Sequence, residues 1–289
     1  MSESVIADFV GKFNASASER GEPATGRVLL SQKRLVLAAD AGKTTIPLSS
    51  IFDVAVGHVP EDLGEFFDST VTIAFRKGDR RHVAAVEADD DKIEKFSTVL
   101  FKALLNGTTM TVKHPARLGG RVTDAAFHPA KLYLKPRRVR FKGPNSTFTV
   151  DLSTVTSFER SQREIDGRPR EVLSVRHMQD GQAMTSLAAV DSGRKMSILG
   201  RYLRLEYSDI VADLKDISLS EDETELLVAV YSTGPEVSLA KVVDVEPTQV
   251  EMLLGDLRDK GLIADGQAET ELTAKGRIVV SDKLEDVNT

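Results

Sequence analysis

Five histidines are the most chemically versatile side chains of this sequence, and their spacing argues against a metal site. No two of them lie three or four residues apart, so no helix would present two imidazoles on one face as zinc ligands. Cysteine is absent, which excludes thiolate nucleophiles, cysteine metal ligands and disulfides. We therefore expect neither a metal site nor a local catalytic pair among His58, His82, His114, His128 and His177.

A second candidate for chemistry is a short phosphate-binding pattern. Gly42-Lys43-Thr44 matches the end of a nucleotide-binding P-loop, but the position of the required first glycine holds Leu37. A helix should follow such a loop, whereas this chain continues as Ile46-Pro47. No Gly-x-Ser-x-Gly elbow occurs either. These observations predict a protein without cofactor, metal or enzymatic activity.

The remaining candidate residues suit binding better than catalysis. A basic run occupies the middle of the chain, and it is consistent with a solvated edge strand whose charge resists aggregation or with a surface for an acidic protein or an anionic lipid. A predicted helix after Pro247 presents a second, mixed surface beside its apolar positions. The candidate partner-binding residues are Lys135, Arg137, Arg138, Arg140 and Lys142 in the first surface and Gln249, Met252 and Asp256 in the second.

The segments that would position these surfaces occur twice, about 104 residues apart. Arg34 and Leu48 return as Arg138 and Leu152, within similar strand patterns. A helical stripe follows each copy, with Ile93, Phe96 and Leu100 in the first and Met196, Leu199 and Leu203 in the second. Several short strands closed by a helix predict two tandem pleckstrin-homology-like domains, although a split barrel of another topology stays possible.

The end of the chain has a different pattern. Ser220-Glu221-Asp222-Glu223 predicts a capping box before an apolar helix, and two further helices, a short hairpin and a last helix follow. That order is typical of a winged helix-turn-helix. The sequence thus predicts an α+β chain with domains at 1–110, 111–216 and 217–289.

Charge is distributed unevenly over these three domains. The chain has a net charge of -6, with -3 in residues 1–110, +7 in residues 111–216 and -10 in residues 217–289. Because DNA affinity depends on neutralising phosphates, the acidic last domain is expected to bind protein rather than DNA. Neither a signal peptide nor a run of 18 apolar residues is visible, so we expect no membrane insertion and a cytoplasmic location.

Three features resemble the archaeal taxis proteins of the CheF family over essentially the full length. They are the opening Met-Ser-Glu-Ser-Val-Ile-Ala-Asp-Phe-Val-Gly-Lys-Phe, the strand pair from Gly26-Arg27-Val28 to Leu37, and the predicted acidic C-terminal winged helix. The resemblance implies an adaptor that receives the phosphorylated response regulator CheY and contacts the archaellum switch components, which controls the direction of rotation. A transcription regulator that holds nucleic acid on its basic middle domain, and a lipid-binding scaffold, are the alternatives.

The charge distribution suggests how partners are divided between the two candidate surfaces. The acidic last domain and the basic second repeat either dock on each other or serve different partners. We favour the regulator at Gln249, Met252 and Asp256, because these residues offer an exposed face beside an apolar core.

Overall fold

The computed structural model of the chain describes residues 4–14, 23–40, 42–57, 70–179, 182–215, 217–232, 239–243, 245–265, 270–273 and 275–280. By its contacts the chain forms two compact units. The first unit contains residues 1–109, 131–134 and 190–205, and the second contains residues 110–130, 135–189 and 206–289.

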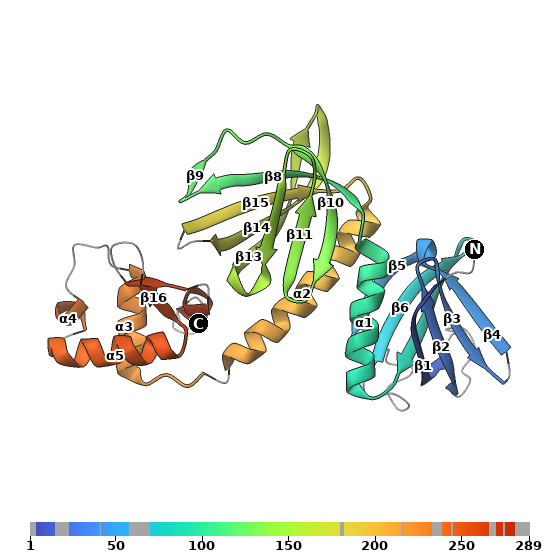
Figure 1. Cartoon of the computed structure of the whole chain (residues 1–289), viewed down its shortest axis with the longest axis horizontal. Coiled ribbons are helices and arrows are strands. Elements are labelled where there is room, and N and C mark those ends of the chain that lie inside the picture. The colour runs from blue at the N-terminus through green and yellow to red at the C-terminus, as the bar shows by residue number, and fades with distance from the viewer. Residues whose placement is uncertain are drawn as a thin grey trace. The chain divides into compact units, whose positions relative to one another are not determined.

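A seven-stranded antiparallel sheet dominates the first unit (Figure 1). Its order is β4-β3-β2-β1-β7-β6-β5, and apolar side chains alternate inward, as Leu35 and Leu37 do on β3. The strands are β1 (Val5–Asn14), β2 (Ala24–Ser31), β3 (Arg34–Ala39), β4 (Gly42–Pro47), β5 (Ile51–Val56), β6 (Thr70–Lys77) and β7 (Arg80–Glu87).

The second large sheet has eight strands in the order β12-β11-β10-β8-β15-β14-β13, and β9 pairs with β8 outside this path. Most of it belongs to the second unit, while residues 131–134 of β10 group with the first. The strands are β8 (Thr109–Leu118), β9 (Arg121–Val122), β10 (His128–Lys135), β11 (Arg138–Lys142), β12 (Thr147–Asp151), β13 (Val155–Ile165), β14 (Arg168–Gln179) and β15 (Gln182–Ala189).

The two large sheets have the same strand order. Strand β8 takes the place of β1, strands β10 to β12 take those of β2 to β4, and strands β13 to β15 take those of β5 to β7. Each copy has a 3-10 turn between its fourth and fifth strands, η1 (Leu48–Ser50) and η3 (Leu152–Thr154). The same backbone bond precedes each turn, since the N–H of Leu48 donates to the carbonyl of Lys33 at 2.8 Å and that of Leu152 to the carbonyl of Arg137 at 2.8 Å. The repeat in the sequence is therefore a repeat in strand order.

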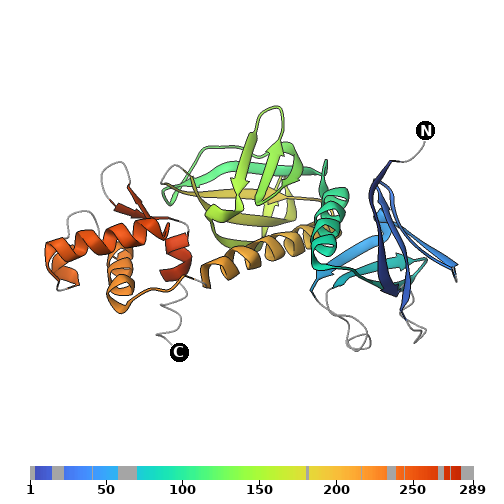
Figure 2. The same cartoon turned by 60° about the horizontal axis from the view of Figure 1, so that its bottom comes forward.

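Helix α1 (Asp90–Leu105) packs on the first sheet (Figures 1 and 2). Ile93, Phe96 and Leu100 are buried, and the ring of Phe96 meets that of Phe9 edge-on at 5.3 Å. The helix begins after Asp89 with two further acids in its first turn, which suits the positive end of a helix. The stripe that was read from the sequence is thus the buried face of α1.

The helix after the second repeat, α2 (Gly193–Lys215), was expected to close the second sheet. Its residues up to 205 instead group with the first unit. There Arg194 Nη1 donates to the carbonyls of Leu48 at 3.1 Å and Ile51 at 2.5 Å, and the ring of Tyr202 lies 5.5 Å from that of Phe101. Periodicity identifies a buried helical face, but it does not say which sheet the face covers.

The C-terminal helical segment, residues 217–280, follows. It contains α3 (Glu221–Ser232), α4 (Leu239–Val242), α5 (Pro247–Asp259), β16 (Ile263–Asp265) and β17 (Thr270–Leu272). The predicted capping box is confirmed, because the N–H of Glu223 donates to Ser220 Oγ at 3.1 Å and the N–H of Ser220 donates to Glu223 Oε2 at 2.7 Å. The apolar cluster of this segment includes Leu226, Leu227, Val250, Leu253, Leu257, Leu262 and Ile263.

The predicted fold class, α+β with two pleckstrin-homology-like domains and a C-terminal winged helix-turn-helix, is wrong. Strands make up 51% and helices 31% of the structure, so antiparallel sheet dominates. The described residues of the C-terminal segment show no winged helix-turn-helix, since α4 is one turn of four residues and each strand of the hairpin has three. Apolar periodicity predicted the helices of this segment. However, Gly234-Pro235 and Pro247 leave few residues between them for the second helix of the predicted motif.

Candidate partner-binding surfaces

The basic run forms the outward face of β11. Arg138, Arg140 and Lys142 are exposed, while the alternating Val139 and Phe141 are buried in the core of the sheet. Strand β11 lies beside the edge strand β12, with Arg140 opposite Thr149 and Lys142 opposite Thr147. The expectation of an edge strand was therefore wrong by one strand. On the β12 side, both cations face uncharged neighbours.

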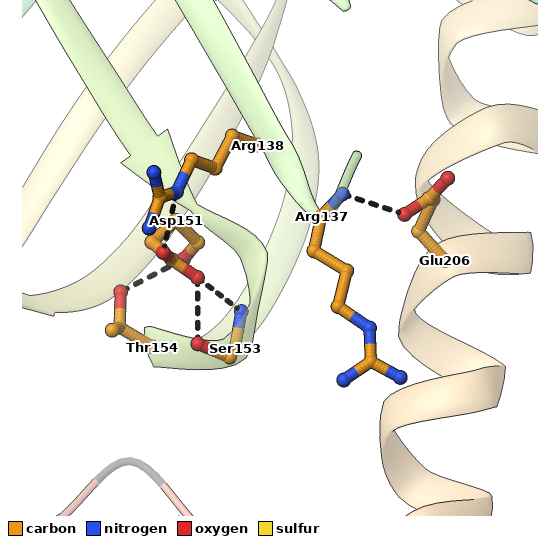
Figure 3. Close-up of polar contacts among 6 residues, drawn as sticks. All are labelled: Arg137, Arg138, Asp151, Ser153, Thr154 and Glu206. Carbon is orange, nitrogen blue, oxygen red and sulfur yellow. Dashed lines mark hydrogen bonds and ion pairs between the residues drawn. The ribbon is translucent and has the colours of Figure 1, made fainter. Parts of the chain in front are cut away.

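Arg138 differs from the other cations of this face because it has a carboxylate opposite. Its Nε donates to Asp151 Oδ2 at 2.9 Å, and Asp151 Oδ1 accepts from Ser153 N at 3.1 Å and Ser153 Oγ at 2.6 Å (Figure 3). Burial raises the pKa of Asp151, but the hydrogen bonds from Ser153 and Arg138 outweigh that effect and lower the pKa below its usual value. Arg138 consequently holds the turn after β12.

Arg137 lies in the tight turn before β11, at the positive φ of 52°. Its backbone N–H donates to Glu206 Oε2 at 3.2 Å, whereas its side chain extends away from the Arg138–Asp151 pair in Figure 3. Lys135 is exposed at the end of β10. The five predicted basic residues thus lie on two adjacent strands and the turn between them, and Arg140 and Lys142 give the open part of the surface.

The first repeat shows that the charges of Arg140 and Lys142 are not needed by the scaffold. At the 104-residue offset, Arg140 corresponds to Val36 and Lys142 to Ala38, on a strand with the same place in its sheet. Asp151 corresponds to Pro47. The same strand order is therefore built with and without these cations.

The second candidate surface lies on α5. Met252 is 61% exposed and Asp256 is exposed, one turn apart on the helix. Gln249 is half-buried, and its Nε2 donates to Asp222 Oδ2 on α3 at 3.4 Å. The structure places the three predicted residues on one face of α5, but Gln249 is partly occupied by its contact with α3.

The chain is similar to known archaeal taxis proteins along essentially its full length. A family model described as "Archaeal Chemotaxis signal transduction system protein F" matches residues 5–209, and a model of a domain of unknown function matches residues 218–285. The chain belongs to the CheF family. It is 48% identical to Taxis protein CheF2 of Halobacterium salinarum over 288 residues, which is 100% of each chain. It is 28% identical to Taxis protein CheF1 of the same organism over 99% of each chain.

The second unit of this CheF-family chain also contains a polar cluster that the sequence did not reveal. Ser186 Oγ lies 2.8 Å from His114 Nδ1 and 3.0 Å from His177 Nε2, and the ring of His114 stacks on Phe148 at 3.9 Å. These histidines are 63 residues apart, so only the register of β8, β14 and β15 could have shown their proximity. His177 is 2% exposed, which makes the cluster part of the core rather than a binding surface.

Burial affects the charge of this cluster. It is the main cause that lowers the pKa of His114 from 6.5 to about 4, with the neighbouring His177 second, and it also lowers the pKa of His177. Across the described ranges, no group of three or more histidine or acidic side chains could hold a metal ion. Across the same ranges, no helix is long and apolar enough to cross a membrane.

Proposed function

We propose that this chain is a cytoplasmic, non-catalytic adaptor of the taxis system. It binds the phosphorylated form of the response regulator CheY and contacts the switch complex of the archaellum motor, and so controls the direction of rotation. Its membership of a chemotaxis signal transduction family supports this role. Two relatives that match it over essentially their full length are also named taxis proteins.

The observation that carries the proposal is the pair of separate exposed surfaces of opposite charge. The outward face of β11 holds Arg140 and Lys142, and α5 presents Met252 beside Asp256. An adaptor needs at least two such surfaces, because it must hold one partner while it responds to another. The scaffold under the basic face exists a second time without those charges, which suggests that they were selected for a partner.

State recognition requires no contact with the phosphoryl group. The adaptor responds to phosphorylation if it binds the altered surface of the regulator more tightly than the unmodified one. A hundredfold preference corresponds to about 2.7 kcal/mol of differential binding free energy. The exposed side chain of Met252 suits this task, since methionine packs well against surfaces that change shape.

We assign the regulator to α5 and the second partner to β11. Two full-length double variants test the assignment, Met252→Asp with Asp256→Lys on α5 and Arg140→Glu with Lys142→Glu on β11. Pull-downs of CheY and of switch-complex proteins are made with each variant, with and without a phosphoryl donor. The α5 variant should lose phosphorylated CheY and keep the switch proteins, and the β11 variant should do the reverse.

Two results would count against the assignment. If the β11 variant loses CheY while the α5 variant keeps it, the surfaces are exchanged. If the full-length chain binds duplex DNA and that affinity falls steeply with salt and disappears in the β11 variant, a nucleic-acid regulator is favoured instead.

A further inference from the structure

The tip of the β6–β7 hairpin in the first unit concentrates positive charge. Arg76, Lys77, Arg80 and Arg81 are all exposed there. The register places Arg76 directly opposite Arg81 and Lys77 directly opposite Arg80. Like charges in directly opposite positions destabilise an antiparallel pair, so two consecutive pairs of this kind work against the stability of the hairpin.

One aromatic ring lies under the guanidinium groups of both arginines of the first pair. The ring of Phe52 on β5 lies 5.8 Å from the guanidinium carbon of Arg76 and 5.7 Å from that of Arg81. The pairing of β5 with β6 has a bulge between Ile51 and Asp53, and such a bulge re-aims the side chain that it contains. Phe52, half-buried at this bulge, therefore holds both cations through their attraction to the face of its ring.

Nearby carboxylates offset this charge only in part, since Asp79 lies in the turn between Lys77 and Arg80 against four cations. Within the part of the chain that the structure describes, none of the four cations takes part in a salt bridge. Asp53 beside Phe52 is already engaged by Arg201, whose Nε and Nη2 donate to its two oxygens at 3.0 Å each. The guanidinium groups over the ring keep their in-plane N–H groups for another ligand.

The second repeat keeps the bulge, between Val155 and Ser157, but it lacks the aromatic ring and the four cations. Ile51 pairs with Phe75 at the start of β5, and the equivalent Val155 pairs with His177 at the start of β13. Phe75 is therefore equivalent to His177, and the residues that follow them in the two hairpins can be matched one by one. The four basic positions correspond to Met178, Gln179, Gln182 and Ala183, and Phe52 corresponds to Thr156. The hairpin is thus built without these cations in one repeat, so the scaffold does not require them.

We propose that Phe52, Arg76, Lys77, Arg80 and Arg81 form a docking site for an acidic segment of a protein partner. Arginines that are held in place bind carboxylates in pairs of parallel hydrogen bonds, and the ring lowers the entropy that they lose on binding. A protein ligand fits better than nucleic acid, because the net charge of -6, with -10 in residues 217–289, repels a long polyanion. This surface is additional to β11 and α5 and does not depend on their assignment.

Binding of a fluorescent oligo-glutamate peptide to the full-length protein tests the proposal. The double variant Arg76→Gln with Arg81→Gln is compared with Arg117→Gln with Arg121→Gln, a matched control that removes two exposed arginines from β8 and β9. The hairpin variant should bind the peptide at least about tenfold more weakly than wild type, since two charge-assisted contacts are lost. The control should bind within about twofold of wild type, because Arg117 and Arg121 belong to the second unit and are not part of the proposed hairpin site.

A second variant tests the role of the ring. Phe52→Leu keeps an apolar side chain at the bulge, and it should weaken peptide binding about threefold through the lost attraction between cations and ring. No binding of the peptide by wild type, or equal loss in the hairpin variant and the control, would overturn the site. Tighter binding of duplex DNA or phosphatidylglycerol vesicles than of the peptide, abolished in the hairpin variant, would overturn the choice of a protein ligand.

Discussion

Arg201 on α2 makes a two-pronged salt bridge with Asp53 on β5, although the two residues are 148 positions apart in the sequence. The Nε and Nη2 atoms of Arg201 donate to the two carboxylate oxygens at 3.0 Å each. Together with the bonds of Arg194 to the carbonyls of Leu48 and Ile51, this pair joins the helix that follows the second repeat to the end of the first sheet. The helix that follows the second repeat therefore stabilises the sheet of the first repeat.

Replacement of Arg201 by alanine should lower the free energy of unfolding only modestly. The two side chains are 45% and 33% exposed, and water screens such a pair, so we expect a loss of about 0.5–1 kcal/mol. Urea unfolding measures it, with Arg204→Ala as a control on the same helix that removes an exposed charge. A loss above that range, absent in the control, would mean that the pair anchors α2 more strongly than its exposure suggests.

Replacement of Phe96 by alanine should be much more costly. Its ring is 1% exposed and contacts Phe9, so the change opens a cavity in the core under α1 and should cost about 3–5 kcal/mol. The adjacent exposed change Lys95→Ala serves as the control and should change stability by less than about 0.5 kcal/mol. Equal midpoints of urea unfolding for the two variants would contradict the packing of α1.

The buried histidine pair should make stability depend on pH. The folded protein holds His114 neutral, since its pKa is lowered from 6.5 to about 4, and the unfolded chain takes up the proton near 6.5. A lowered pKa in the folded state means that stability is complete above pH 6.5 and decreases as the pH falls towards 4. His114→Phe keeps a ring on Phe148, and its unfolding midpoint should depend less on pH in this window. An unchanged slope would show that other groups cause the dependence.

The capping carboxylate of α3 supplies a further test. Glu223 is 5% exposed and accepts a bond from Lys260 Nζ at 2.5 Å. Burial raises the pKa of Glu223, but the hydrogen bonds from Lys260 and Ser220 outweigh burial, so the pKa lies below its usual value. The contribution of this carboxylate to stability should therefore be lost as the pH falls through the lowered pKa. Lys260→Met leaves the buried carboxylate short of a donor and should cost about 1–3 kcal/mol in urea unfolding. A loss below that range would show that water replaces the ammonium group.

The sequence predicted the local and repeated parts of the structure best. The 104-residue offset between Arg34 and Arg138 indicates equivalent strands in the two sheets. The stripe of Ile93, Phe96 and Leu100 indicates the buried face of one helix. Both follow from side-chain periodicity, which the backbone geometry fixes. The capping box at Ser220 and Glu223 was predictable for the same reason, because its partners are three residues apart.

Long-range relationships were not predictable in this way. The stacking of Phe52 against Arg76 and Arg81 depends on a bulge and on strand register, and the cluster of His114, His177 and Ser186 depends on three strands that meet only in the folded sheet. The winged helix-turn-helix was wrongly predicted because helix order alone does not fix helix length. Of the predicted partner-binding residues, Met252 and Asp256 are exposed as expected, whereas Arg138 is paired with Asp151.

The most direct test of the adaptor is the affinity of the full-length chain for CheY, measured by titration with and without a phosphoryl donor. The phosphorylated form should bind much more tightly, with a preference of about a hundredfold, or about 2.7 kcal/mol. Met252→Asp with Asp256→Lys should abolish that preference, and Arg140→Glu with Lys142→Glu should leave it intact. Equal affinity for both forms of CheY would contradict the central claim.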